Sequence, residues 1–175
     1  MDKPQVGIVM GSDSDYPVME ETSKILNQFG VAHEVLVASA HRSPERTRNY
    51  TRKAKRRGIK VLIAGAGAAA HLAGMIAAES TLPVIGVPID SSSLQGLDSL
   101  LSTVQMPGGI PVASMAIGKA GAKNAGLLAV QILALNNETL SAKLTKYKKE
   151  QAKAVERKSR NIKPANADNK KGRRK

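Results

Sequence analysis

Residues Val6–Met10 (VGIVM) form a short, β-branched apolar run, and the small polar residues Gly11–Asp15 (GSDSD) follow it directly. An apolar run of this length is typical of a buried strand, and the polar residues after it are typical of a turn that leads into a helix. The same order recurs along the chain. Alternation of this kind predicts a parallel sheet with right-handed crossovers and helices on both faces.

Five such β-α units can be read from the sequence. We expect strands at residues 6–10, 32–37, 61–64, 83–88 and 112–117. Helices are expected at residues 16–29, 44–57, 97–104 and 120–135, with an Ala-rich helix after the Gly-rich turn at 65–75. The predicted fold class is a three-layer α/β/α sandwich with a doubly wound, five-stranded parallel sheet that resembles flavodoxin, followed by a C-terminal helix.

The charge of the chain is unevenly distributed. The formal net charge is +13, but residues 1–142 hold 13 Lys and Arg against 11 Asp and Glu, whereas residues 143–175 hold 14 against 3. We therefore expect one α/β domain at residues 1–136 and a helix at 137–160 that docks on the domain or on a neighbouring subunit. Residues 161–175 are polar and basic, and we expect a disordered tail. A nucleic-acid partner is disfavoured because the basic excess belongs to this C-terminal region alone.

Composition excludes several classes of chemistry. The chain has no Cys, which rules out disulfides, zinc-thiolate sites and thiol nucleophiles. The first apolar run is too short for a signal peptide, and no stretch is long and apolar enough to span a bilayer. We expect a cytoplasmic protein without a membrane partner. The three His residues lie in separate segments without metal-ligand spacing, so no metal site is predicted.

Three loops follow the first three strands: Gly11–Asp15, Ser39–Arg42 and Gly65–His71. The carboxyl ends of parallel strands meet at one edge of the sheet, where open α/β sheets bind ligands. The second loop places His41 beside Arg42. The imidazole of His41 is suited to acid–base catalysis near neutral pH, and the guanidinium of Arg42 can bind an anion through two parallel hydrogen bonds. Alone, these two residues are more typical of a solvated surface loop than of a catalytic site.

The first loop favours a phosphorylated sugar as ligand. Ser12 and Ser14 offer hydroxyls near a helix N-terminus, which suits a phosphate, and Arg42 can add a bidentate contact. The carboxylate of Asp15 suits sugar hydroxyls. A simple helix cap is the competing interpretation of the same residues.

The third loop formally matches a dinucleotide-binding fingerprint, Gly65-x-Gly67-x-x-Ala70. That fingerprint normally follows the first strand and needs an acid at the end of the next one, and neither condition is met here. Small residues such as Gly67 and Ala68 instead let a flat ring lie against the backbone. Ser39 and His71 complete our set of substrate-binding candidates, although His71 by itself is typical of a structural residue at a helix start.

Several of these segments together resemble the N5-carboxyaminoimidazole ribonucleotide mutase family of purine biosynthesis, the class I catalytic subunit of phosphoribosylaminoimidazole carboxylase. The likeness covers about residues 5–136, and five separated motifs carry it: Gly11–Asp15, Ser39–Arg42, Gly65–Met75, Gly86–Pro88 and Ser102–Val112.

The resemblance implies isomerisation of N5-carboxyaminoimidazole ribonucleotide to 4-carboxy-5-aminoimidazole ribonucleotide, without a metal or an organic cofactor. Carried over by motif, Ser12, Asp15 and Arg42 bind the substrate and His41 is the catalytic acid and base. The resemblance also implies a homo-octamer.

Two departures from the family pattern concern the third loop. The family usually has Gly and Pro where this chain has Ala68 and Ala73, and a methyl group at Ala68 crowds the ring if the position needs a positive φ. Arg42 separates the chain from the related branch that carboxylates aminoimidazole ribonucleotide directly, which typically has Lys there. That direct carboxylase, a non-catalytic nucleotide-binding module and a nucleic-acid-binding protein driven by the tail remain the alternatives.

Overall fold

The computed structural model describes residues 3–162 and contains a single five-stranded, all-parallel sheet with the strand order β2-β1-β3-β4-β5. The strands are β1 (Val6–Met10), β2 (His33–Val37), β3 (Val61–Gly67), β4 (Val84–Ile89) and β5 (Ala113–Ser114). The α-helices are α1 (Tyr16–Phe29), α2 (Pro44–Ala54), α3 (Leu72–Glu79), α4 (Leu97–Val104), α5 (Gly118–Ala134) and α6 (Glu138–Arg160). Short 3₁₀ turns, η1 (Asp13–Asp15) and η2 (Lys55–Arg57), precede α1 and follow α2. This is the doubly wound, flavodoxin-like order that the alternation predicts.

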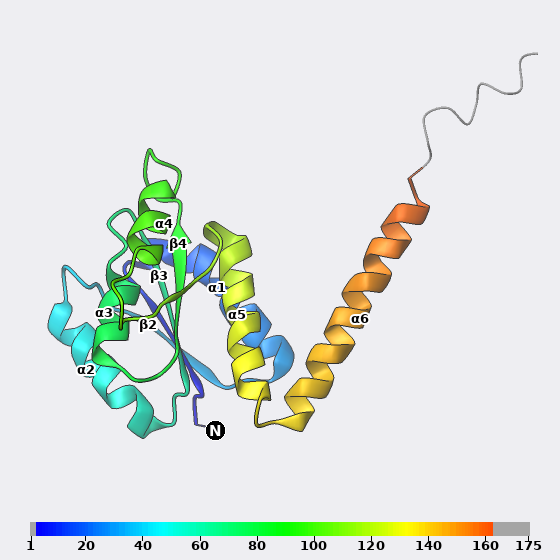
Figure 1. Cartoon of the computed structure of the whole chain (residues 1–175), viewed down its shortest axis with the longest axis horizontal. Helices are drawn as coiled ribbons and strands as arrows, with labels where there is room; N and C mark the ends of the chain where they lie inside the picture. The colour runs from blue at the N-terminus through cyan, green and yellow to red at the C-terminus, as the bar shows by residue number, and fades with distance from the viewer. Residues whose placement is uncertain (1–2, 163–175) are drawn as a thin grey trace, which may run out of the picture.

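Helices lie on both faces of the sheet (Figure 1), and one hydrophobic cluster fills each of the two interfaces. Alternate residues of β1 point to opposite sides, so Ile8 packs with α1 and α5, whereas Val9 packs with α2 and α3. Helices α1 and α5 approach closely because Gly126 faces Ile25: a Cβ atom at position 126 would lie 2.9 Å from the Ile25 Cβ atom. The three-layer prediction is confirmed.

The register of the central strands fixes where the loops lie. Met10, the last residue of β1, is paired with Val37 at the end of β2 and with Gly65 in β3. The Ala38 amide donates to the Met10 carbonyl at 2.9 Å, and the Gly11 amide donates to the Gly65 carbonyl at 3.2 Å. The first three strand-end loops therefore leave the sheet at the same edge and height.

The fifth strand is shorter than predicted. We expected residues 112–117, but only Ala113–Ser114 pair with β4 before the chain turns towards α5 at Gly118. One further hydrogen bond, from the Met115 amide to the Gly86 carbonyl at 2.8 Å, keeps the segment against the sheet. β5 is an edge strand. The apolar residue Met115 follows the two paired residues and packs on the core without pairing to β4 as a strand residue.

Helix α6 contacts the body of the protein only near its beginning. Leu140 is buried, and Leu144 and Tyr147 pack beside it, with Tyr147 edge-on to Phe29 at 5.6 Å between ring centroids. Beyond Tyr147 the helix runs away from the sheet (Figure 1). The predicted disordered tail falls almost wholly outside the described residues, which end at Ile162. Within residues 3–162, no helix has the length and apolar character needed to cross a membrane.

Candidate active site

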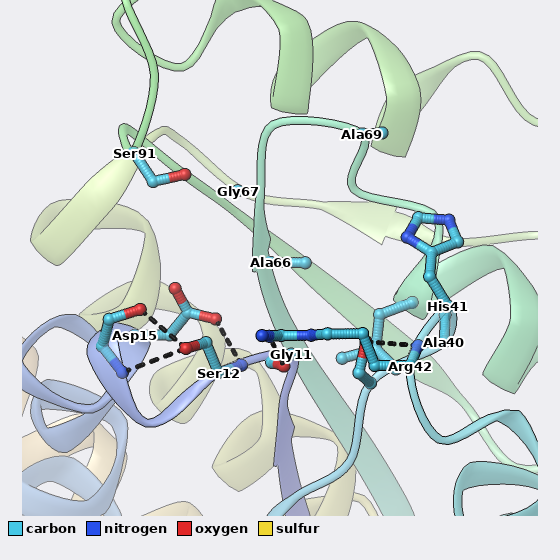
Figure 2. A pocket seen from close by; sticks show the side chains of 13 residues that line it. Gly11, Ser12, Asp15, Ala40, His41, Arg42, Ala66, Gly67, Ala69 and Ser91 are labelled. Carbon is cyan, nitrogen blue, oxygen red and sulfur yellow. Dashed lines mark hydrogen bonds between the residues drawn. The ribbon is translucent and has the colours of Figure 1, made fainter.

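The three strand-end loops enclose a cavity of about 450 Å³ at the carboxyl edge of β1, β2 and β3 (Figure 2). Its size lies in the range of small-molecule sites. The cavity is lined by Gly11, Ser12, Ser14, Asp15, Ser39, Ala40, His41, Arg42, Ala66, Gly67, Ala69, Leu72 and Ser91.

The first loop is held by a capping box. The Ser12 amide donates to Asp15 Oδ2 at 3.0 Å, and the Ser12 hydroxyl accepts hydrogen bonds from the amide and hydroxyl of Ser14 at 3.4 and 2.8 Å. The helix-cap interpretation is only partly correct: the cap belongs to the 3₁₀ turn η1, whereas Asp15, the N-cap residue of α1, makes no side-chain capping hydrogen bond. The same residues also line the cavity. Capping orients the carboxylate and the hydroxyls rather than removing them from the ligand's reach.

Asp15 is the buried carboxylate of the site. Only 5% of the residue is exposed, and this burial raises the pKa of its carboxyl group above the ordinary value. The hydrogen bond from the Ser12 amide and the positive charge of Arg42 act in the opposite direction. A carboxylate in this position is costly for the empty protein, and donors from a ligand would stabilise it.

Arg42 extends across the floor of the cavity towards the first loop (Figure 2). Its Nη2 atom donates to the Gly11 carbonyl at 2.9 Å. Within residues 3–162, no carboxylate lies within ion-pair distance of this guanidinium. The remaining donors of Arg42 are thus available for an anionic ligand such as a phosphate.

His41 and His71 meet at the opposite side of the cavity. His41 Nε2 lies 2.8 Å from His71 Nδ1, and the two rings are edge to face, with centroids 5.0 Å apart and an angle of 88° between their planes. One proton lies between the two nitrogens, so one ring donates and the other accepts. His71 is the residue before α3, and it therefore connects the catalytic candidate to the start of a helix.

The third loop forms a wall of small residues. A Cβ atom at position 67 would collide with the Ser91 hydroxyl, so Gly67 is needed for the close approach of the loop that follows β4. Ala68 adopts a positive φ of 50°, the conformation that favours glycine. The wall thus presents backbone and methyl groups to the cavity.

The structure brings most of the predicted site residues to one cavity. Ser12, Ser14, Asp15, Ser39, His41, Arg42 and Gly67 line it. Ala68 and His71 do not, although Ala68 borders the wall and His71 contacts His41. Sequence reasoning missed Ser91, which follows the fourth strand at the same sheet edge and would have been found by extending the strand-end argument by one strand.

The described residues contain no group of three or more His, Cys, Asp or Glu side chains placed to hold a metal ion. The groups that converge on the cavity are instead an imidazole, a guanidinium, a carboxylate and several hydroxyls. Together with the sheet topology, they define a doubly wound α/β protein with a polar cavity at the carboxyl ends of its strands.

Comparison with known proteins agrees with a doubly wound α/β protein and identifies the family. The AIR carboxylase family model matches residues 5–154, and the chain belongs to that family. The N5-carboxyaminoimidazole ribonucleotide mutase of Pyrococcus horikoshii is 56% identical over 161 residues, which cover 92% of this chain and 90% of the relative. The Bacillus subtilis protein of the same name is 59% identical over 142 residues, 81% of this chain and 88% of that protein.

A solved structure supports the fold independently. The crystal structure of Treponema denticola PurE superposes with a TM-score of 0.83 at 28% sequence identity, covering 92% of this chain and 99% of that one. The likeness extends over nearly the whole described chain. The family resemblance seen in the sequence motifs is thereby confirmed.

Proposed function

We propose that this chain is an isomerase of purine biosynthesis that converts N5-carboxyaminoimidazole ribonucleotide into 4-carboxy-5-aminoimidazole ribonucleotide. The observation that supports it most strongly is the cavity where three groups face one space: an imidazole, a buried carboxylate and a guanidinium that has no carboxylate partner among residues 3–162. Relatives that bear the mutase name are 52–59% identical to it.

In this proposal the loops divide the substrate between them. The phosphate binds to Arg42 and to the hydroxyls of Ser12 and Ser14, and the ribose hydroxyls donate to Asp15. The imidazole ring lies against the backbone of Gly67, in the wall that presents backbone and methyl groups to the cavity. This orientation directs the carboxylated nitrogen towards His41.

His41 then transfers protons in both directions. It donates a proton to the carbamate nitrogen as the nitrogen–carbon bond breaks, which gives aminoimidazole ribonucleotide and carbon dioxide. Carbon four of the ring attacks the carbon dioxide, and the proton displaced from that carbon returns to His41. The numbers of protons donated and recovered are equal, so the overall reaction is an isomerisation.

Retention of carbon dioxide makes the second step effectively intramolecular. Ala40, Ala66 and Ala69 also line the cavity, and their methyl groups offer no hydrogen bonds, which suits a small apolar gas. His41 Nδ1 has no hydrogen-bond partner among residues 3–162, whereas Nε2 contacts His71. We assign the proton transfer to Nδ1 and the holding of the ring to His71.

Direct carboxylation of aminoimidazole ribonucleotide is the competing reaction. A coupled assay on the full chain, with N5-carboxyaminoimidazole ribonucleotide in one arm and aminoimidazole ribonucleotide plus bicarbonate in the other, separates the two. We expect fast conversion in the first arm only. Conversion in the second arm alone would make the chain a carboxylase, and tight ribonucleotide binding without turnover would make it a binding module.

The wider context is part of the same proposal. We propose a cytoplasmic homo-octamer in which residues 1–136 carry the reaction and residues 137–160 dock on the domain or on a neighbouring subunit. Helix α4 supports assembly because Leu97, Leu101 and Val104 are each about half exposed along one stripe, at 53%, 49% and 48%. Sedimentation of the full chain tests the octamer: a stable monomer at micromolar concentration contradicts it.

A further inference from the structure

Ser43 occupies the N-cap position of α2 but does not cap the helix. Its backbone has φ −142° and ψ 55°, and its side chain makes no hydrogen bond to the free amides of the first turn. Serine at this position ordinarily accepts such a bond, and the helix is less stable without it. The hydroxyl of Ser43 is therefore used elsewhere.

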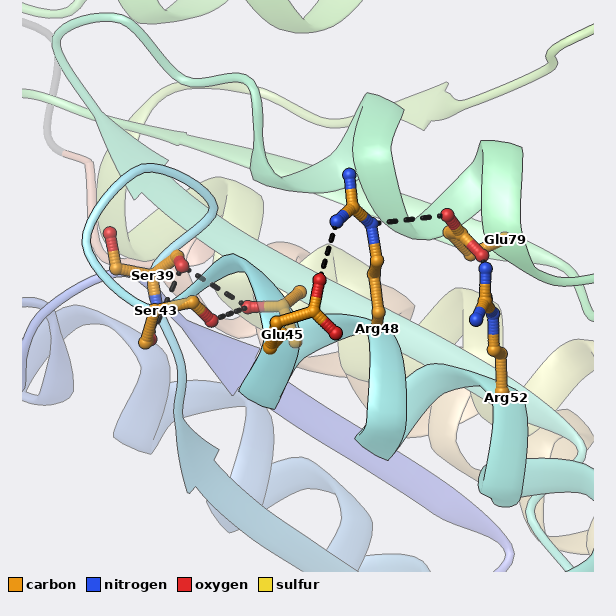
Figure 3. A network of polar contacts seen from close by, with 7 residues as sticks. Ser39, Ser43, Glu45, Arg48, Arg52 and Glu79 are labelled. Atoms are coloured by element: carbon orange, nitrogen blue, oxygen red, sulfur yellow. Dashed lines mark hydrogen bonds and ion pairs between the residues drawn. The ribbon is translucent and has the colours of Figure 1, made fainter.

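The hydroxyl folds back onto the peptide groups of Ser39 (Figure 3). Ser43 Oγ accepts a hydrogen bond from the Ser39 amide at 2.9 Å and donates to the Ser39 carbonyl at 3.2 Å. One side chain thus holds both backbone polar groups of a residue four positions earlier. The backbone amide of Ser43 adds a third bond, to the Ser39 carbonyl at 3.1 Å.

Thr47 supports this contact from one helical turn further on. It is 1% exposed, and its hydroxyl lies 3.2 Å from the Ser39 carbonyl and 3.3 Å from the Ser43 carbonyl. The Ser39 hydroxyl in turn accepts a hydrogen bond from the Arg42 amide at 3.1 Å. The turn between Ser39 and Ser43 is closed at both ends by these bonds.

The three residues inside that turn are Ala40, His41 and Arg42, all of which line the cavity. We propose that Ser43 is a positioning residue of the reaction: its hydroxyl clamps Ser39 and so fixes the directions in which His41 and Arg42 project. This inference rests on the proposed function, since His41 and Arg42 have their roles there. Without the clamp, the His41 imidazole and the Arg42 guanidinium are still present but displaced. Small displacements of reacting groups lower the rate strongly.

The test compares Ser43→Ala, Ser43→Thr and Asn137→Ala with the wild-type chain. Asn137 caps α6 through a hydrogen bond from the Leu140 amide at 3.0 Å, far from the cavity, so its removal costs a cap without touching the site. Ser43 is half-buried, which leaves room for the extra methyl group of threonine. The readouts are kcat and KM for N5-carboxyaminoimidazole ribonucleotide and the urea midpoint of unfolding.

We expect Ser43→Ala to lower kcat by roughly 10-fold to 100-fold and to raise KM as well, because His41 and Arg42 move together. Ser43→Thr restores both constants to within about threefold of wild type, because the hydroxyl is retained. Asn137→Ala lowers the urea midpoint and leaves kcat and KM unchanged. If Ser43→Ala fails to fold, Thr47→Val takes its place, with Thr47→Ser as the rescuing variant.

Wild-type constants in Ser43→Ala, or a loss that threonine does not restore, would overturn the positioning role. So would a loss of activity that matches the loss of folded protein. If the wild-type chain itself shows no turnover, the proposed function fails. The clamp is then judged by calorimetry with 4-carboxy-5-aminoimidazole ribonucleotide, whose affinity Ser43→Ala must weaken and Asn137→Ala must not.

Discussion

Arg42 and Arg52 lie on the same segment of the chain, ten residues apart, yet their surroundings differ. Arg52 Nε donates to Glu79 Oε2 at 2.8 Å, and Arg48 shares the same glutamate at 3.5 Å while also pairing with Glu45 at 2.7 Å (Figure 3). Arg42 instead contacts a backbone carbonyl and leaves its other donors open to the cavity. A guanidinium that is already paired with a carboxylate has fewer donors left for a ligand than one that is not.

The difference also separates stability from function. The pairs of Arg48 and Arg52 are partly exposed to solvent, and pairs of this kind contribute about 0–1 kcal/mol to stability. They connect α2 to the end of α3. At the cavity the Arg42 guanidinium hydrogen-bonds the Gly11 carbonyl, and we propose that a bound anion takes its other donors. Variants of the two regions should therefore fail in different ways.

The largest effect is expected from the proton carrier. His41→Asn lowers kcat by roughly 100-fold to 10,000-fold, the usual contribution of general acid–base catalysis, and changes ribonucleotide affinity only slightly. His33→Asn is the matched control, because His33 lies in β2 and its one side-chain hydrogen bond among residues 3–162 is with the Val31 carbonyl, at 3.1 Å. Turnover measured with both variants checks this. Normal turnover in folded His41→Asn would remove His41 from the mechanism.

The two arginines provide the next comparison. Arg42→Lys keeps the charge but loses the forked donors, and we expect KM to rise about 10-fold or more because charged hydrogen bonds contribute about 1.5–3 kcal/mol. Arg52→Lys leaves KM unchanged and alters the free energy of unfolding by less than about 1 kcal/mol. Steady-state kinetics and urea unfolding give both quantities. Equal changes in KM for the two variants would contradict the distinction between them.

Asp15 provides a test in stability rather than in rate. Its burial raises its pKa in the folded protein, so the folded state holds the proton more tightly than the unfolded state does. The stabilising contribution of Asp15 is complete below its ordinary pKa of 3.8 and is lost as the pH rises through the raised value. We therefore expect Asp15→Asn to be more stable than wild type at pH 7, while ribonucleotide binding is lost.

Unfolding curves at several pH values check this sign. The stability advantage of Asp15→Asn should shrink as the pH falls towards 3.8. An advantage that grows in acid, or a variant less stable than wild type at pH 7, would show that the carboxylate stabilises the empty fold.

The smallest effect concerns Ala68. Its φ of 50° is a left-handed conformation, which costs an L-residue roughly 1 kcal/mol. Ala68→Gly should raise the free energy of unfolding by about 0.5 kcal/mol, since part of the relief is offset by the greater freedom of unfolded glycine. KM should stay constant, because Ala68 does not line the cavity. A clear loss of stability would mean that the methyl group packs favourably where it is.

Much of the fold can be predicted from simple sequence patterns. The order of apolar runs and polar turns gives the parallel sheet, and the rule that ligands bind at strand carboxyl ends brings Ser12, His41 and Gly67 to one edge. The fifth strand is the exception, because its apolar residues pack on the core without pairing. Apolar character alone does not tell those two uses apart.

The contacts within the site follow less easily. His41 and His71 are thirty residues apart, and their meeting depends on the register of β1 with β3 and on the length of each loop. The use of the Ser43 hydroxyl is likewise hidden, since serine before Pro44 is typical of a helix cap. In both cases the sequence shows which polar side chains are present, but the tertiary structure determines which groups they contact.

The most direct test of the central claim is a crystal structure of the wild-type chain with 4-carboxy-5-aminoimidazole ribonucleotide bound. The predicted result places the phosphate within hydrogen-bond distance of Arg42 and Ser12, the ribose hydroxyls on Asp15, and the new carboxyl group beside His41. A ribonucleotide bound elsewhere, for example in the cavity lined by Leu82, Pro83 and Pro111, or bound with its phosphate away from Arg42, would contradict the assignment of this site.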